Sequence, residues 1–310
     1  MEKNILSILD VKQEIGELID LGIKLKNEIK NGKSFDYLKN KKMVMIFERA
    51  SMRTRLSSEL SMNLLGGYAV YLNKDDIAIG RREAVKDIAL VLSRYADIIV
   101  YRALKKEDLQ EMAQHATVPV INGLDRDEHP CQILADLMTI KEHKGRLNGL
   151  TLAFVGDGDD NLTHSYLLGC TSVGMNVIVI SPKEYWPNTI FVDKAKNISE
   201  TNNCKVTITD DISYVKNADI LVTDTWISLW DEDERQQRLE DFNFFKITQE
   251  IMSIAKPDAL FMHCMPIYYG EEVVQEVAHG PRSIILDEAE NRLWMQMALI
   301  TKILNPNYSI

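Results

Sequence analysis

The sequence predicts an α/β protein with two doubly wound, parallel-sheet domains. Short apolar runs rich in β-branched residues alternate with amphipathic segments of helix length, which is the pattern of parallel-sheet α/β units. The runs fall into two sets, separated by a long helical segment that ends near Gly145 and Gly149. Several runs end in polar residues, and open α/β sheets bind ligands at the carboxyl ends of their strands. Polar side chains are therefore expected along one edge of each sheet.

The expected strands are read from these apolar runs. The first set comprises MVMIFE (43–48), YAVYL (68–72), DIIVYR (97–102) and VPVIN (118–122). The second set comprises LTLAFVGD (150–157), NVIVISP (176–182), KVTIT (205–209), DILVTDTW (219–226), ALFMHCMP (259–266) and SIILDE (283–288). Apolar residues recur at helical spacing in 1–20, 129–149 and 291–304, which predicts helices there. We expect a first domain over 1–145, completed by a returning helix within 289–310, and a second over 146–288.

Composition and charge exclude several classes of protein. The chain has 310 residues and a formal net charge of −10, so it is a poor general ligand for nucleic acid or anionic membranes. No apolar run approaches the roughly 20 residues of a membrane span, and the N-terminal segment lacks the pattern of a signal peptide. We therefore expect a soluble, cytoplasmic protein whose anionic ligand, if it has one, is small.

The cysteines indicate neither a disulfide framework nor a metal site. Cys131, Cys170, Cys204 and Cys264 are scattered and form no CxxC pair, so free thiols are expected. His263 and Cys264, together with His129 and Cys131, are residue types that could bind zinc. Adjacent residues on a strand point to opposite faces, however, and we expect no bound metal on that argument.

The stretch ERASMRTRLSSEL (48–60) carries arginines into an acidic chain directly after an expected strand. Ser51 is a good N-cap, so residues 52–55 should form a first helical turn whose N–H groups, with the arginine side chains, suit a phosphate. A solvated basic turn is the alternative, although arginine at a helix N-terminus opposes the helix dipole. Leu56, Leu60 and Leu64 form an apolar stripe on the same helix.

Three further segments carry polar residues at strand ends. GDGDDN (156–161) lacks the third glycine of a dinucleotide fingerprint and has three aspartates, so it suits a cationic ligand better than NAD or a flavin. In TDTWISLWDEDE (223–234), Asp224 could hold an ammonium group or cap a helix, and 231–234 read as a solvated acidic helix start. HCMP (263–266) offers a thiol, and EHP (128–130) a histidine; a buried small residue is the alternative for the thiol.

Taken together, these motifs resemble the aspartate/ornithine carbamoyltransferase family, and most closely its ornithine branch. The matching elements are SMRTR (51–55), HPCQ-x-LAD (129–136), D-x-W-x-S (224–228), HCMP (263–266) and DEAENR (287–292), in family order and spacing. The resemblance covers essentially the whole chain. It implies a carbamoyl-phosphate domain and an amino-acid domain joined by two interdomain helices. It also implies a homotrimer, or a multiple of trimers, with active sites between subunits.

The resemblance also implies a role for each matching residue. The positions for carbamoyl phosphate are Ser51, Met52, Arg53, Thr54, Arg102, His129, Gln132, Cys264, Met265 and Arg292. The positions for the α-amino and carboxylate groups of ornithine are Asn161, Asp224, Ser228 and Leu229. The catalytic group would be Arg102, His129, Cys264 and Asp224. The neutral δ-amine of L-ornithine would attack carbamoyl phosphate to give citrulline and phosphate, a step of arginine metabolism that needs neither metal nor organic cofactor.

The chain departs from the family pattern at four places, and they keep alternatives open. A glutamine supplied by the neighbouring subunit is Ala78 here, and the SMG element reads Ser228-Leu229-Trp230. After HCMP the chain has Tyr268 and Tyr269, where the family commonly has small and basic residues. Where the family has two consecutive asparagines, this chain has Asp160 and Asn161. A carbamoyltransferase for another amine, such as putrescine, and a non-catalytic metabolite-binding paralogue therefore remain as alternatives.

Overall fold

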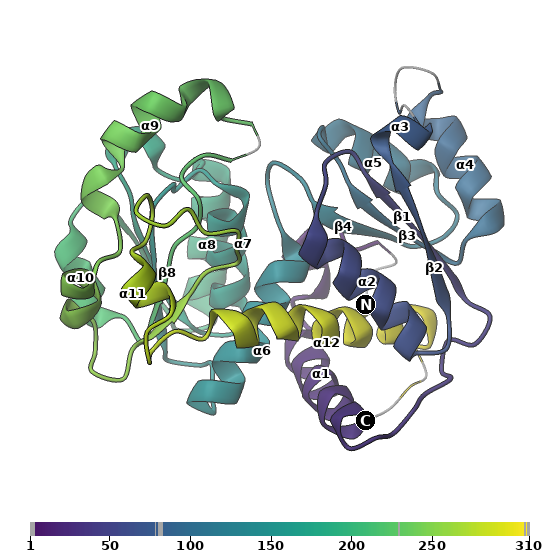
Figure 1. Ribbon diagram of the computed structural model, residues 1–310, viewed down its shortest axis with the longest axis horizontal. Helices are drawn as coiled ribbons and strands as arrows, with labels where there is room; N and C mark the ends of the chain where they lie inside the picture. Colours follow the sequence, from purple (N-terminus) through teal and green to yellow (C-terminus); the bar gives the residue numbers. More distant parts are fainter. Residues whose placement is uncertain (1–3, 78, 80–82, 229, 307, 309–310) are drawn as a thin grey trace. The chain divides into compact units, whose positions relative to one another are not determined.

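A computed structural model describes residues 4–77, 79, 83–228, 230–306 and 308. The chain divides into two compact units, Met1–Met138 with Glu290–Ile310, and Thr139–Ala289, called here the first and the second unit. Two long helices, α6 (Pro130–Lys144) and α12 (Ile285–Leu304), each contain one of the points of division (Figure 1). Among the described residues, every helix is too short or too polar to cross a bilayer.

The first unit contains a four-stranded parallel sheet in the order β2-β1-β3-β4. Its strands are β1 (Lys42–Phe47), β2 (Tyr68–Asn73), β3 (Ile98–Arg102) and β4 (Val120–Leu124), close to the expected runs. The chain leaves β1 toward one side of the sheet and β3 toward the other. The segments after these two strands therefore diverge, and in open sheets of this kind ligands bind at such a point.

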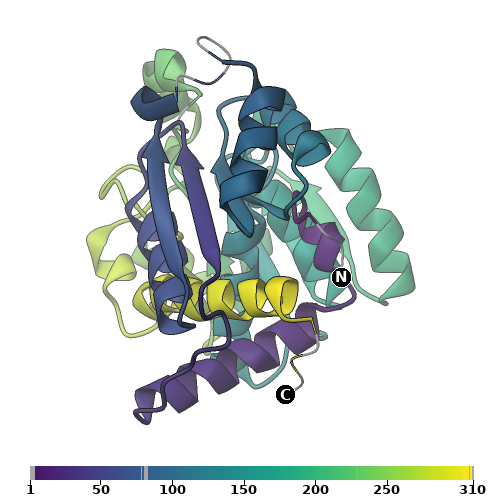
Figure 2. The ribbon, with the colours of Figure 1, turned by 90° about the vertical axis from the view of Figure 1, so that its right-hand side faces the viewer.

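Helices cover both faces of this sheet. They are η1 (Ile8–Val11), α1 (Ile15–Lys30), α2 (Met52–Leu64), α3 (Lys74–Ile77), α4 (Val85–Tyr95) and α5 (Lys106–His115), with parts of α6 and α12. Side chains alternate along β1, and Val44 and Ile46 share one apolar cluster with α4 and α5. Figure 2 shows α1 and α12 side by side. Gly22 permits this approach, because a Cβ there would lie 2.9 Å from Met295 Sδ.

The second unit contains a five-stranded parallel sheet in the order β7-β6-β5-β8-β9. The strands are β5 (Thr151–Val155), β6 (Asn176–Ile180), β7 (Val206–Thr209), β8 (Ile220–Val222) and β9 (Leu260–Met262). Its helices include α7 (Asn161–Ser172), α8 (Thr189–Thr201), α9 (Arg235–Asp241), α10 (Gln249–Ile254) and α11 (Gln275–Ala278). The order changes direction between β5 and β8, so the segments after these strands diverge. The α/β class with parallel sheets is thus confirmed.

The run SIILDE is not a strand, and that prediction is wrong. Only Ser283 makes an isolated bridge, to Phe261, and α12 begins at Ile285. The acidic residues Asp287 and Glu288 lie in the first turn of α12, where the helix dipole favours negative charge. The apolar run therefore starts a helix that continues to Leu304.

The leucine stripe of α2 is not its buried face. Leu56 is 48% exposed and Leu60 is 44% exposed. The buried face instead contains the small residues Ser57, Ser58 and Ser61. Ser61 Oγ donates to the carbonyl oxygen of Leu293 at 3.1 Å, so these small side chains allow α2 to approach α12 closely. The leucines remain on the surface of the first unit.

Candidate active site

The loop after β1 leads into a helix start capped by Ser51, as the sequence predicts. Ser51 has an extended backbone and caps α2, because its Oγ accepts the N–H of Thr54 at 3.3 Å. Thr54 is 2% exposed, whereas Met52 is 65% exposed. The backbone N–H groups of a helix start attract anions. A methionine is compatible with this turn, since its side chain points to solvent.

Arg292 binds two of the expected site residues. It lies on α12 within the first unit and is buried. Its Nη2 donates to Thr54 Oγ1 at 3.0 Å, and its Nη1 donates to Gln132 Oε1. The start of α2, the first turn of α6 and the third turn of α12 therefore meet at one guanidinium. A buried guanidinium with five N–H donors is suited to a phosphate or carbonyl oxygen.

Gln132 has a fixed amide orientation. Its Nε2 donates to Asp136 Oδ1 at 2.8 Å, and its Oε1 faces Arg292. A carboxylate accepts only and a guanidinium donates only, so the reverse orientation would break both hydrogen bonds. Asp136 is fully buried and belongs to the same motif as Gln132. Its role behind the glutamine was not part of the sequence-based expectation.

His129 is held as a neutral imidazole. Burial, followed by the positive charges of Arg292, Arg102 and Arg53, keeps the pKa of His129 well below its usual value. The three guanidiniums therefore act on one imidazole, although they come from α12, the end of β3 and the start of α2. A neutral imidazole beside this positive cluster is suited to donating one hydrogen bond to a carbonyl oxygen.

Arg55 faces a different partner. Its guanidinium carbon lies 3.9 Å from the centre of the Tyr71 ring, and its Nε lies 3.7 Å from Glu59 Oε2. Both partners are on α2 or the neighbouring strand β2. Within the arginine-rich stretch, Arg53 thus lies near His129, whereas Arg55 stacks on an aromatic ring.

In the second unit, the end of β8 and the segment after β9 bring a carboxylate and a thiol together. The Cys264 thiol donates to Asp224 Oδ1 at 3.2 Å. Burial raises the pKa of Asp224, and the nearby His263 partly opposes that shift. Met265 has φ +60°, a left-handed conformation that is unusual for a non-glycine residue and is frequent at functional sites.

The prediction that His263 and Cys264 point in opposite directions is wrong. β9 ends at Met262, so the alternation of a strand does not extend to them. Possible ligand atoms of Asp224, His263 and Cys264 lie within 4.8 Å of one another. Both ring nitrogens of the histidine contact protein groups, however. Its Nδ1 accepts the Met265 N–H at 2.9 Å, and its Nε2 lies 3.2 Å from a Glu272 oxygen, so a metal would have to displace one of them.

Asn161 begins α7 and Asp160 is its N-cap. Asp160 Oδ1 accepts the Leu162 N–H at 2.8 Å, and its Oδ2 accepts from Asn161 Nδ2 at 3.2 Å. Burial, and then the charge of Asp224, raise the pKa of Asp160 well above its usual value. This edge of the sheet therefore concentrates carboxylates, which favours a cationic group in a ligand.

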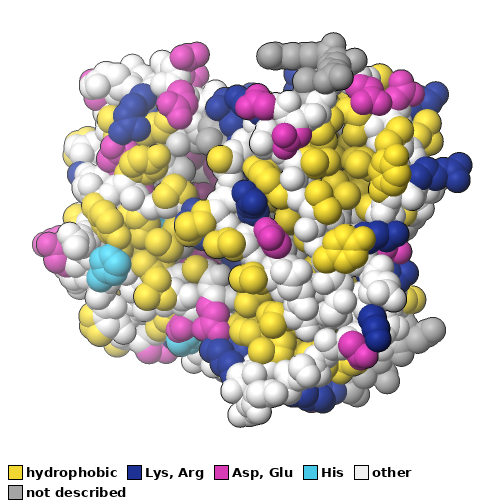
Figure 3. Space-filling view, turned by 45° about the vertical axis from the view of Figure 1, so that its right-hand side comes forward, with side chains coloured by type: hydrophobic (Ala, Val, Ile, Leu, Met, Phe, Trp, Pro, Cys, Tyr) yellow, Lys and Arg dark blue, Asp and Glu magenta, His cyan; other side chains and the backbone are white. Residues whose placement is uncertain are grey.

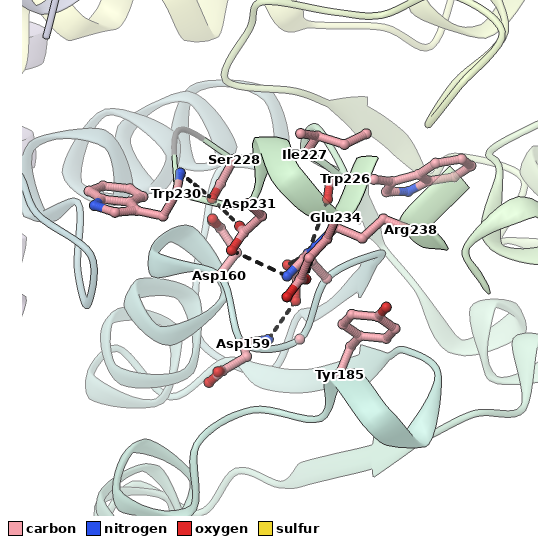
Figure 4. Close-up of polar contacts among 12 residues, drawn as sticks. Asp159, Asp160, Tyr185, Trp226, Ile227, Ser228, Trp230, Asp231, Glu234 and Arg238 are labelled. Carbon is pink, nitrogen blue, oxygen red and sulfur yellow. Dashed lines mark hydrogen bonds and ion pairs between the residues drawn. The ribbon is translucent and has the colours of Figure 1, made fainter. Parts of the chain in front are cut away.

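Ser228 lies in the segment between β8 and α9. Its hydroxyl donates to Asp231 Oδ2 and accepts the Trp230 N–H at 3.3 Å. The reading of 231–234 as a solvated acidic helix start is wrong for Asp231, whose side chain is only 14% exposed. Asp231 and Glu234 are both bound by Arg238, a buried arginine that the sequence analysis missed (Figure 4). Its only sequence signal was the i,i+4 spacing from Glu234.

The expected residues thus gather in two groups, one in each unit. The group of the first unit contains Thr54, Gln132 and Arg292 in direct contact, with His129 beside the arginines. In the second unit, the contacts join Asp224 to Cys264 and Ser228 to Asp231. Two positions named from the sequence, Leu229 and Ala78, lie outside the described residues.

Comparison with known proteins identifies the family. The carbamoyl-P binding domain of the aspartate/ornithine carbamoyltransferases matches residues 3–142, and their Asp/Orn binding domain matches residues 148–303. Ornithine carbamoyltransferase of Caldicellulosiruptor saccharolyticus is 46% identical over 290 residues, which are 93% of this chain and 94% of that relative. The catabolic ornithine carbamoyltransferase of Thermoplasma volcanium is 43% identical over 305 residues, covering 98% and 99%.

Solved structures agree with this assignment. Ornithine carbamoyltransferase from Pyrococcus furiosus is similar with a TM-score of 0.94 and 39% identity, over 97% of each chain. The anabolic enzyme from Campylobacter jejuni has a TM-score of 0.92 and 34% identity, over 99% of this chain and 100% of that one. The chain belongs to the aspartate/ornithine carbamoyltransferase family, and the resemblance seen in its motifs is confirmed.

Proposed function

We propose that this protein transfers the carbamoyl group of carbamoyl phosphate to L-ornithine, giving L-citrulline and phosphate. The observation that carries the proposal is the cluster around Arg292, which holds Thr54 and Gln132 and, with two more arginines, keeps His129 neutral. Full-length relatives that carry the name ornithine carbamoyltransferase support the same activity.

Carbamoyl phosphate is bound by the first unit in this proposal. The N-terminal turn of α2, with Ser51, Met52, Arg53 and Thr54, receives the phosphate through backbone N–H groups and a guanidinium. Gln132 and His129 bind the carbamoyl group, and Arg102 and Arg292 bind oxygen atoms that carry charge. Cys264 and Met265 of the second unit complete the set proposed for this substrate.

The amino acid is bound by the carboxylate-rich edge of the second unit. Asp224 and Ser228 bind the α-ammonium group, while Asn161, with the position of Leu229, is assigned to the carboxylate. The hydrogen bond from Cys264 to Asp224 supports this arrangement, because it orients a carboxylate that burial would otherwise tend to protonate.

The chemical step requires no metal. An amine with a pKa near 10 is mostly protonated at neutral pH, so the δ-ammonium first loses a proton. Its nitrogen lone pair then attacks the carbonyl carbon and forms a C–N bond and an oxyanion. Arg102, His129 and Thr54 stabilise that oxyanion, and removing one such donor typically costs about 3 kcal/mol in the barrier. The C–O bond to phosphate then breaks, phosphate leaves with its electron pair, and the nitrogen releases its second proton.

We also propose a homotrimer in the cytoplasm. The exposed leucines of α2, together with Tyr68 and Val70 of the edge strand β2, form an apolar surface on the first unit, and Figure 3 shows hydrophobic side chains gathered there. A contiguous apolar patch on a folded chain indicates a protein interface. All four cysteines are free thiols, as expected in a reducing compartment.

The experiment is a parallel assay of purified protein with carbamoyl phosphate and ornithine, lysine or putrescine. Citrulline from ornithine, with little product from the other amines, supports the proposal. Product from putrescine alone would identify a diamine carbamoyltransferase, which Trp230 at the usual glycine position motivates. No product with any amine would indicate a binding protein instead.

A further inference from the structure

Arg238 is a buried arginine that binds two loops of the second unit at once. It lies on α9, and its side chain is 9% exposed. Its Nη1 donates to the Asp157 carboxylate and to the Trp226 carbonyl oxygen, the latter at 3.1 Å. Its Nη2 lies 3.4 Å from Asp231 Oδ1, and its Nε donates to Glu234 Oε2 at 3.0 Å. Figure 4 shows the guanidinium among these groups.

This arrangement is expected to add little to the free energy of folding. A buried ion pair gives up the hydration of both charges, and apolar replacements of such pairs are often neutral or stabilising. A guanidinium does, however, fix the directions of its partners, because its five N–H groups form a rigid planar fork. The geometry therefore favours a role in orienting the groups around Arg238.

The two loops are the ones that carry the residues matched to ornithine. Asp157 lies in the turn from β5 to α7, which leads directly to Asn161. Trp226 and Asp231 lie on either side of Ser228, in the segment from β8 to α9. One guanidinium therefore fixes the positions of both segments relative to each other.

The contact of Asp231 with Ser228 decides which hydrogen bond the serine can offer. A hydroxyl has one proton to donate and two lone pairs that accept. The proton goes to Asp231, and one lone pair receives the Trp230 N–H. The described part of the chain provides no donor for the second lone pair. Ser228 can therefore accept from an ammonium group, whereas it has no proton left for a carboxylate.

We propose that Arg238 is a positioning residue for the amino-acid substrate. Through Asp231 it keeps the Ser228 hydroxyl as an acceptor for the α-ammonium group, and through Asp157 it holds the turn that carries Asn161. This inference rests on the proposed function, because it takes ornithine as the ligand. The arginine cluster proposed for carbamoyl phosphate belongs to the first unit, so the effect of Arg238 is selective for the amino acid.

The test measures both Michaelis constants for Arg238→Gln, Arg238→Lys and Asp231→Ala. We expect the KM for ornithine to rise about tenfold or more in each, because a hydrogen bond to a charged group is misplaced, while the KM for carbamoyl phosphate changes less than about twofold. The double variant Arg238→Gln with Asp231→Ala should be no worse than the poorer single variant, since both act through Ser228.

Arg235→Gln is the matched control. Arg235 is on the same helix, is exposed and pairs with Glu271, so its loss should leave both constants unchanged. A purely structural role for Arg238 would lower the yield of active protein, or kcat, without a selective change in the KM for ornithine, and this result would overturn the inference. Should Arg238→Gln fail to fold, the lysine and Asp231 variants carry the same test. Absence of citrulline from the unmodified protein would instead overturn the proposed function, and the inference with it.

Discussion

Arg292 and Thr54 are 238 positions apart in the chain, yet Arg292 Nη2 donates to Thr54 Oγ1 at 3.0 Å in a buried contact. The contact joins the last long helix of the chain to the helix start that is proposed to bind phosphate. The same guanidinium donates to Gln132, so three segments depend on one side chain. The proposed anion site of the first unit is therefore assembled by tertiary structure and not by its loop alone.

Asp136 gives the first prediction, because it fixes the amide of Gln132. In Asp136→Asn, the asparagine amide can pair with Gln132 in either orientation of the glutamine side chain. The reversed orientation turns Gln132 Nε2 toward Arg292, where two donors face each other. We expect the KM for carbamoyl phosphate to rise about tenfold, with the KM for ornithine unchanged. Steady-state kinetics measure both. Glu142→Gln, an exposed site on the same helix, is the control, and an equal rise there would contradict this explanation.

Asp224 gives the second prediction. In Asp224→Asn the charge that is proposed to pair with the α-ammonium group is lost, and the thiol of Cys264 loses an ionised acceptor. We expect the KM for ornithine to rise about tenfold or more, with little change for carbamoyl phosphate. The exposed Asp233→Asn serves as the control in the same assay. An unchanged KM for ornithine would exclude Asp224 from the amino-acid site.

The third prediction concerns Glu128, a carboxyl buried beside the proposed catalytic histidine. Burial raises the pKa of Glu128 to about 7, although its carboxylate accepts the Ile8 N–H at 3.0 Å. Between about pH 4.5 and pH 7 the folded state keeps a proton that the unfolded state has lost. The contribution of Glu128 to stability is therefore full below this window and is lost as pH rises through it, by about 3 kcal/mol.

Glu128→Gln removes this dependence and keeps an acceptor for Ile8. Urea denaturation at pH 5 and pH 8 measures the effect. Relative to the unmodified protein, the variant should gain about 2.5 kcal/mol in unfolding free energy between the two pH values, because part of the effect already occurs below pH 5. The exposed Glu107→Gln should show no such gain. The same pH dependence in the Glu128 variant and the unmodified protein would contradict the assignment.

The exposed leucines of α2 give the fourth prediction. Leu60→Glu adds a charge to the apolar surface proposed as the subunit interface, and it should produce folded monomers, because the side chain is already partly in solvent. Analytical ultracentrifugation reports the mass, and circular dichroism reports the fold. Phe244→Glu, at an 83% exposed site in the second unit, should leave the assembly unchanged. A Leu60 variant that remains a trimer would locate the interface elsewhere.

Much of the fold could be predicted because buried parallel strands are continuous apolar runs. The strands of both sheets were found within a few residues, and the helix start at Ser51 was identified from its capping residue. SIILDE was misread because a short apolar run does not distinguish a strand from the first turn of a buried helix. The leucine stripe of α2 was visible in the sequence, but helical spacing identifies a face without saying whether that face meets the core or another chain.

The site was predictable only where a motif carried it. Arg53, His129 and Cys264 stand in motifs whose spacing the sequence displays. Arg238 is a basic residue on a polar helix and stands in none of these motifs. Asp136 does stand in HPCQ-x-LAD, but the motif does not show that its carboxylate holds the Gln132 amide. Their importance arises from partners far away in the sequence or behind another side chain, and only the folded chain reveals these contacts.

The arginine cluster of the first unit is proposed, above all, to bind carbamoyl phosphate. The most direct measurement is the KM for carbamoyl phosphate and the kcat of Arg53→Gln, with citrulline as the product and Arg55→Gln as the control at the stacked arginine. We expect Arg53→Gln to raise this KM about tenfold or more and to lower kcat, and Arg55→Gln to affect both far less. Unchanged affinity and turnover after the loss of Arg53 would contradict the account.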